Sequence, residues 1–179
     1  MRRILAVLVV AVALLLAVLV GWDFIAPVRH VPQLASADGR ATSIVVEKRS
    51  RLLTLFHDDK VIKTFRVSLG RDPIGAKERE GDSRTPEGHY VIDSKNPRSH
   101  FHLALHISYP DAEDRAHAAL RDVPPGSDIM IHGLPNGLGW LGRLHLLHDW
   151  TDGCIAVTDP EIGQIWALVD TGTPIQIRP

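Results

Sequence analysis

The chain has 179 residues, of which 45% are hydrophobic and 23% are charged, as in an ordinary globular domain rather than a disordered segment. Its 20 basic and 21 acidic side chains leave a formal net charge of -1, which excludes nucleic-acid binding as the main function because polyanions require a basic surface. The single cysteine, Cys154, excludes an internal disulfide framework and a multi-cysteine metal site.

The first predicted element is a membrane-spanning signal-anchor over residues 1–25. Ile4–Val20 contains only Ile, Leu, Val and Ala, and with the next few residues it is long enough to cross a bilayer. Arg2 and Arg3 favour a cytoplasmic N-terminus. A cleaved signal peptide is the alternative, but the small-residue site at 35–37 is far from the apolar run. We therefore expect the rest of the chain outside the cytoplasm.

Residues 26–42 lack hydrophobic periodicity and contain Pro27, Pro32, Ser36 and Gly39, which is typical of a linker. The folded domain is expected over residues 43–179.

Within that domain, short β-branched or alternating apolar runs predict strands. The expected strands are 44–46, 53–56, 61–67, 89–92, 103–108, 129–131 (ending at His132) and 173–177. Helices are expected at 112–120, where Asp111 can cap, and at 159–169, where Asp159 can cap and Pro160 suits the first turn. The charged, Gly- and Pro-rich stretches 70–86 and 133–150 read as loops. The sequence thus predicts a mainly β fold, a mixed sheet closing on itself with a few short helices.

Cys154 is the first candidate for chemistry. It follows Gly153, which permits a tight turn, and it precedes an apolar stretch. A thiol attacks as the thiolate, so it needs a base, and backbone N–H groups at such a turn can stabilise an oxyanion. The alternative is a small buried hydrophobic residue.

His132 is the best-placed base among the 10 histidines. It ends an apolar strand and is followed by Gly133, so a rigid strand would hold its ring at the mouth of a loop. A satisfied residue at the sheet edge is the alternative. His145 and His148 are weaker candidates within the loop.

Three ordered motifs carry a resemblance to a known family. Ile129–Gly133 and Thr151–Ile155 together resemble the signature of the L,D-transpeptidase catalytic domain, also called the YkuD domain, in which a histidine and a spacer precede Ser/Thr-His-Gly-Cys. The stretch Gly81–Gly88 resembles the family's Thr-Pro-x-Gly approach to the sheet. The resemblance spans about residues 43–179.

The resemblance implies a β-rich sandwich or barrel and a cysteine-dependent acyltransferase. Cys154 would be the nucleophile and His132 the general base, and Gly153 and Cys154 would offer oxyanion N–H groups. Thr151 and Gly133 match motif positions.

The implied substrates are peptidoglycan stem peptides. By this resemblance the enzyme would release a terminal D-Ala, form a thioester and pass the acyl group to an amine, and it would need neither metal nor cofactor. The implied place is the periplasmic side of the bacterial envelope, with residues 4–25 anchoring the chain in the inner membrane.

Two residues depart from the family pattern. Asp152 replaces the motif histidine, and Ala156 stands near a position where many members have Arg or Asn. Asp152 could bind a cationic amine or raise the basicity of a histidine. Trp140 and Trp150, within or beside the spacer, could form a lid over the substrate or simply pack the loop.

Alternatives remain open. Residues 108–115 resemble a segment of family members that are hydrolases, with Tyr109 and Arg115 as candidate substrate contacts, so a carboxypeptidase or a peptidoglycan–lipoprotein amidase is the second reading. A turn followed by a solvated helix would also explain that segment. A zinc hydrolase and a non-catalytic wall-binding module are weaker alternatives; the first would draw on His100, His102, His106, His132, His145 and His148.

Overall fold

The computed structural model describes residues 31–179 of the protein. The expected membrane-spanning segment lies outside these described residues. Among the residues from 31 onward, no helix combines the length and apolar character needed to cross a bilayer.

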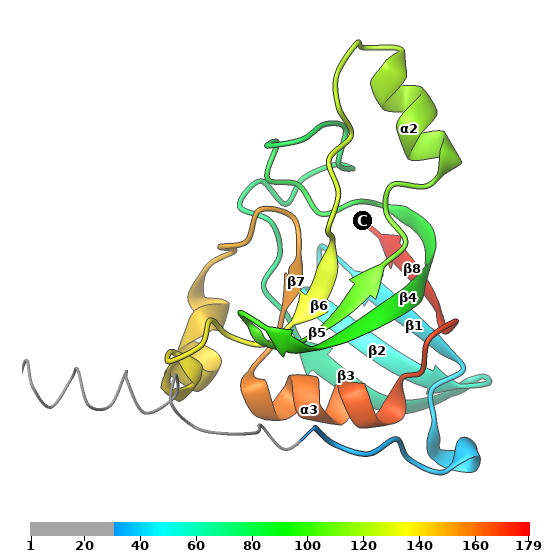
Figure 1. Ribbon diagram of the computed structural model, residues 1–179, viewed down its shortest axis with the longest axis vertical. Coiled ribbons are helices and arrows are strands. Elements are labelled where there is room, and N and C mark those ends of the chain that lie inside the picture. The colour runs from blue at the N-terminus through cyan, green and yellow to red at the C-terminus, as the bar shows by residue number, and fades with distance from the viewer. Residues whose placement is uncertain (1–30) are drawn as a thin grey trace, which may run out of the picture.

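One curled sheet forms the body of the domain (Figure 1). In space its strands follow the order β3-β2-β1-β8-β4-β5-β6-β7, and only the β1–β8 and β6–β7 pairs are parallel. The strands are β1 (Ser43–Glu47), β2 (Leu52–His57), β3 (Lys60–Arg66), β4 (Gly88–Ser99), β5 (His102–Ile107), β6 (Met130–His132), β7 (Ile155–Ala156) and β8 (Pro174–Arg178). The expectation of a mainly β, mixed sheet is confirmed.

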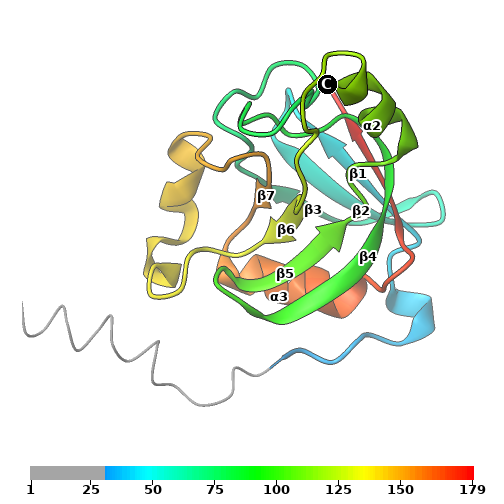
Figure 2. The ribbon, with the colours of Figure 1, turned by 45° about the horizontal axis from the view of Figure 1, so that its top comes forward.

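Helices are few and short. Two α-helices, α2 (Ala112–Ala119) and α3 (Asp159–Leu168), and two 3-10 segments, η1 (Ala37–Gly39) and η2 (Gly139–Leu147), accompany the sheet within residues 31–179. Helix α3 packs against β5, whereas α2 stands at the far end of the molecule (Figures 1 and 2).

Alternating side chains explain the core. Ile44 and Val46 on β1 and Leu53 and Leu55 on β2 point inward and are buried, while their neighbours along each strand are more exposed. Helix α3 adds its apolar face, formed by Ile162, Ile165 and Trp166. Burial of these side chains from both layers is the main stabilising contribution to the fold.

The curl of the sheet brings its last strand back to the segment that follows β3. Ser68 and Ala156 exchange backbone hydrogen bonds of 3.0 and 2.8 Å, and the N–H of Thr151 donates to the carbonyl of Leu69 at 3.1 Å. The loop that ends at Cys154 is therefore fixed on both sides.

Some elements differ from expectation. Thr158, not Asp159, is the N-cap of α3, and the Glu161 carboxylate accepts from its backbone N–H and hydroxyl at 3.0 and 2.6 Å. Asp159 instead accepts from the backbone N–H of Leu134 at 2.8 Å. The expected loop 133–150 contains η2, and β4 extends to Ser99.

Part of the expected linker lies along α3. The N–H groups of Ala35 and Ala41 donate to the carbonyls of Ala167 and Leu168 at 2.7 and 2.8 Å. Packing on the domain thus begins before β1.

Candidate active site

A cavity of about 540 Å³ opens beside the ends of β6 and β7. Cys154 and His132 both line it, together with Trp150, Thr151 and Asp152. The remaining lining residues come from three other parts of the chain: Arg71, Asn96, Ser99, His100, Phe101, Asp128 and Met130.

Strand register places the two reactive side chains on one side. His132 is the last residue of β6 and pairs with Ala156 on the parallel strand β7. Cys154 lies two positions before Ala156, so it shares the face of the sheet to which that residue belongs. The pairing of β6 with β7 therefore places His132 and Cys154, which are far apart in the sequence motif, along the same cavity.

The ring of His132 is oriented by a backbone carbonyl. Its Nδ1 lies 2.7 Å from the carbonyl oxygen of Gly133, which can only accept, so Nδ1 carries the proton. This tautomer leaves Nε2 as a proton acceptor. The rings of Phe101 and Trp150 enclose the imidazole, with centroids at 4.5 and 5.8 Å.

Burial keeps His132 neutral. Its side chain is only 3% exposed, and this desolvation lowers the pKa of the imidazole to about 4, although the Gly133 carbonyl acts in the opposite direction. The nearby His145 lowers this pKa further. A neutral imidazole with a free Nε2 can act as a general base.

The thiol of Cys154 is uncharged in the same environment. Its sulfur lies 3.5 Å from the carbonyl oxygen of Asp128. Burial raises the pKa of the thiol, and the carboxylates of Asp128 and Asp152 raise it further, while a hydrogen bond from the Met130 backbone lowers it. A base is therefore needed to form the thiolate.

Thr151 holds the turn before the thiol. Its hydroxyl donates to the carbonyl of Cys154 at 2.7 Å and accepts from the N–H of Gly153 at 3.2 Å. The N–H of Gly153 is thus engaged with Thr151 in this structure. Gly153 has φ +134°, and a Cβ there would come within 2.7 Å of the Arg84 carbonyl oxygen, so this position requires glycine.

Gly133 serves a different purpose. A Cβ at this position would lie 2.6 Å from a carboxylate oxygen of Asp159. The absence of a side chain lets Asp159 reach the N–H of Leu134 and tie the end of β6 to α3.

Sequence reasoning missed Arg71. Its guanidinium lies 2.5 Å from the carboxylate of Asp152, and both charged groups are largely exposed at the cavity. The N–H of Arg71 donates to the carbonyl of Thr151 at 3.0 Å. No sequence signal links two residues 81 positions apart, because the curl of the sheet brings them together.

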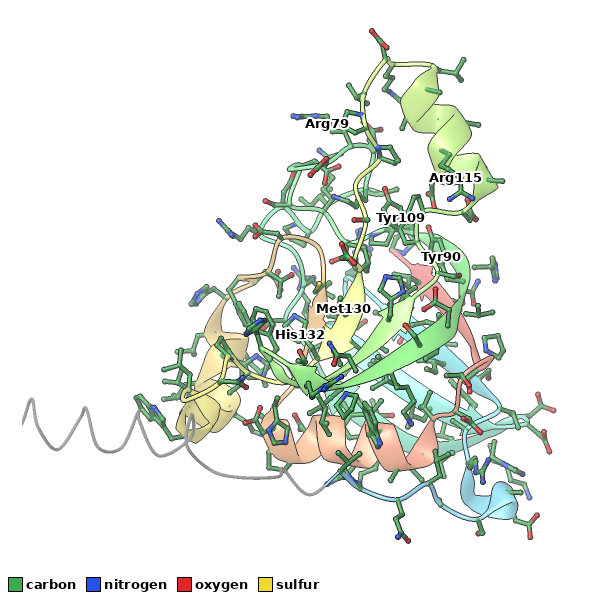
Figure 3. The ribbon with its side chains drawn as sticks, viewed as in Figure 1. Arg79, Tyr90, Tyr109, Arg115, Met130 and His132 are labelled. Carbon is green, nitrogen blue, oxygen red and sulfur yellow. The ribbon has the colours of Figure 1, made fainter. Side chains whose placement is uncertain are left out.

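The structure separates other candidates from this cavity. Tyr109 is buried and donates to the carbonyl of Pro125 at 2.8 Å, and Arg115 lies on α2 with its guanidinium on the Pro110 carbonyl. Figure 3 shows Arg115 well away from His132. Neither Tyr109 nor Arg115 lines the cavity, and Trp140 is exposed on η2, so of the two expected lid tryptophans only Trp150 borders it.

The histidines do not converge on a metal site. Among residues 31–179, no three or more His, Cys, Asp or Glu side chains are arranged to hold a metal ion. His145 is buried next to Ser68, and the hydroxyl of Ser68 donates to the backbone carbonyl of His145 at 2.9 Å.

Comparison with known proteins agrees with this geometry. The family model of the YkuD L,D-transpeptidase catalytic domain matches residues 41–177. YafK of Escherichia coli (strain K12), a provisionally named L,D-transpeptidase, is 27% identical over 137 residues, which is 73% of this chain and 48% of YafK. The chain thus spans about half the length of the curated relatives it matches.

Solved structures share the fold. The helical cell shape determining protein Pgp2 from Campylobacter jejuni superposes with a TM-score of 0.59 and 22% identity, covering 91% of this chain and 55% of Pgp2. An L,D-transpeptidase from Mycobacterium smegmatis gives a TM-score of 0.51 and 15% identity, covering 76% of this chain and 58% of that protein. Because the family model covers most of the chain and the cavity places the motif residues together, this protein belongs to the L,D-transpeptidase catalytic domain (YkuD) family.

Proposed function

We propose that this protein is a peptidoglycan L,D-transpeptidase that works through a cysteine acyl-enzyme on the outer side of the cytoplasmic membrane. The observation that carries the proposal is the pairing, in one cavity, of an uncharged thiol with a neutral imidazole whose Nε2 is free to accept a proton. Family membership supplies the substrate class, a stem peptide with an L-residue followed by a terminal D-Ala.

The first half-reaction follows from these protonation states. As the sulfur of Cys154 attacks the carbonyl carbon, its proton moves to Nε2 of His132. The negative charge develops on the carbonyl oxygen. Because the N–H of Gly153 is engaged with Thr151, the N–H of Cys154 is the principal motif donor for this oxyanion. The C–N bond then breaks, D-Ala leaves with the proton from His132, and a thioester remains.

The second half-reaction returns the enzyme. An acceptor amine attacks the thioester carbonyl and gives its proton to His132, and the thiol is restored as the amide forms. If water takes the place of the amine, the product is a shortened stem peptide. Arg71 and Asp152 form an exposed ion pair at the cavity, where the guanidinium of Arg71 can bind a substrate carboxylate and the carboxylate of Asp152 can bind an amine.

The test is mass spectrometry of the intact protein after incubation with a disaccharide-tetrapeptide. We expect one adduct whose mass corresponds to the substrate without D-Ala, absent from Cys154→Ala. His132→Gln should slow adduct formation about 100-fold or more, the usual contribution of a general base.

His148→Gln is the matched control, because His148 is an exposed histidine of the same loop that does not line the cavity. An adduct in Cys154→Ala at the wild-type rate would refute the mechanism. Cross-linked dimers among the products indicate transfer, whereas shortened monomers alone favour the hydrolase alternative.

A further inference from the structure

The segment η2 exposes an unusual concentration of apolar side chains. Trp140 is 75% exposed, Leu144 58% and Leu147 80%, and Leu138 at the start of the segment is 39% exposed. These residues lie within the ten positions 138–147, and the segment η2 lies at one corner of the molecule, beside the sheet (Figures 1 and 2). Large apolar side chains that are exposed together on one short segment often belong to an interaction surface.

Arginines border this apolar corner. Arg49 and Arg66 line a hollow of about 380 Å³ together with Leu147, and neither of them makes an ion pair with another described residue. Arg143 is exposed within η2, and its guanidinium is 3.8 Å from Glu161. Asp149, the acidic group in the hollow, is already paired with Arg51 at 2.7 Å. The corner therefore combines aromatic and aliphatic groups with unneutralised positive charge.

The N-terminal part of the chain enters the domain next to η2. Arg143 of η2 approaches Glu161 in the first half of α3, and the ring of Pro32 packs on the same half of α3, 3.7 Å from the position of a Cβ on Gly163. Only 11 positions separate Val31 from Val20, the end of the uninterrupted apolar run in the sequence. Fully extended, that length of chain reaches about 40 Å, so, with the apolar run in a membrane as the proposed function has it, Val31 stays within that distance of the bilayer.

We propose that η2 and its neighbouring arginines form a surface that rests on an anionic lipid bilayer. Trp140, Leu144 and Leu147 enter the boundary between headgroups and acyl chains, and the arginines meet lipid phosphates. A second copy of this chain fits less well, because a symmetric contact would bring the same arginines together.

Trp140 itself provides the readout. The full chain is reconstituted in vesicles of phosphatidylcholine and phosphatidylglycerol whose acyl chains carry bromine, a quencher of tryptophan emission. The difference between wild type and Trp140→Phe isolates Trp140 from Trp22, Trp150 and Trp166. We expect its emission to be quenched by the brominated lipid and protected from aqueous acrylamide.

Two variants and one control sharpen the result. Leu147→Ser should return the Trp140 emission towards its value in water. Arg143→Gln should lower the ratio of protein with Trp140 in the lipid to protein with Trp140 in water about fivefold, as expected for one arginine near an anionic surface. Leu120→Ser, a change of an equally exposed leucine beyond α2, should have no effect. Unchanged thermal unfolding shows that each variant is folded.

The proposal is overturned if acrylamide reaches Trp140 equally with and without vesicles and bromine has no effect. It is also overturned if Trp140 becomes protected without lipid as the protein concentration rises, which would indicate contact between copies. No substrate is present, so this outcome is independent of the acyl-enzyme test.

Discussion

Cys154 and His132 line the same cavity as neutral groups rather than as a thiolate–imidazolium pair. Burial raises the pKa of the thiol and lowers the pKa of the imidazole to about 4, so each shift opposes formation of the ion pair. The thiolate is then formed during attack, with substrate in place, and not held in the resting enzyme. Such a resting state protects the thiol from adventitious electrophiles.

Asp152 provides a test of this electrostatic balance. Its carboxylate raises the pKa of the Cys154 thiol, so Asp152→Asn should lower that pKa and increase the thiolate fraction at pH 7.5. The rate of alkylation by iodoacetamide, followed by mass spectrometry, should rise by a factor of roughly two to five, as expected for one exposed charge.

The control for this change is Glu113→Gln, which removes an exposed carboxylate on α2, outside the cavity. It should leave the alkylation rate unchanged. A rate for Asp152→Asn that equals or falls below the wild-type rate would contradict the assigned influence of this carboxylate.

At the scale of elements, alternation and capping predicted most of the fold. Strands β1, β2 and β3 lie within a residue or two of the expected runs. In β1 and β2 the inward positions are apolar, whereas β3 buries only Phe65. Strand β7 has only two residues, too few to show a period. Segment η2 is interrupted at Gly142, whose backbone is not helical, so it shows no regular α-helical period.

The cavity residues could be predicted from the sequence only where motifs identify them. His132 and Cys154 could be paired from motifs that lie on adjacent elements. Arg71 and Phe101 could not, because their places at the cavity depend on how far the sheet curls, which is a property of the whole domain. Tyr109 is buried and does not line this cavity, a placement that the sequence pattern of its segment does not reveal.

The loop 70–86, which carries Arg71, is tied to the sheet by a buried lysine. Lys48 is 2% exposed, and its ammonium donates to the carbonyls of Gly75 and Thr85 at 2.5 and 2.9 Å and to the Glu87 carboxylate at 2.7 Å. Burial lowers the pKa of this lysine, and Glu87 counteracts that shift.

Lys48→Met should therefore loosen the loop while preserving most of the aliphatic packing. We expect a loss of about 2–4 kcal/mol in the free energy of unfolding, because two carbonyls and a carboxylate lose their partner. Hydrogen exchange should accelerate over residues 75–87. Adding Glu87→Gln should recover part of the stability, and Lys60→Met, on an exposed lysine, should change little. An unaltered exchange pattern in Lys48→Met would show that the loop is held by other contacts.

At the scale of the whole molecule, the closing of the sheet links the active site to global stability. The hydrogen bonds between Ser68 and Ala156 and between Thr151 and Leu69 join the two edges of the sheet directly beside the cavity. His132 is buried within this closed domain, against the rings of Phe101 and Trp150, so its protonation is coupled to unfolding of the domain as a unit.

This coupling fixes a pH dependence of stability. The pKa of His132 is about 4 in the folded protein and about 6.5 in the unfolded chain, so below pH 6.5 the unfolded state binds a proton that the folded state excludes. The contribution of His132 to the free energy of unfolding is therefore fully present above pH 6.5. It falls as the pH drops, until the imidazole also becomes protonated in the folded protein near pH 4. The difference of roughly 2.5 units corresponds to about 3 kcal/mol.

His132→Gln isolates this contribution, because it removes the titrating group and leaves the carboxylates and His145 in place. Urea unfolding of wild type and variant between pH 7.5 and pH 4 should give free-energy curves whose separation changes steadily below pH 6.5, with wild type losing the additional stability. The separation between the two curves should stay constant above pH 6.5, where the imidazole of His132 is neutral in both the folded and the unfolded protein. Parallel curves across the whole range would mean that the ring is protonated in the folded protein, and the neutral base required for acyl transfer would then be absent at mildly acidic pH.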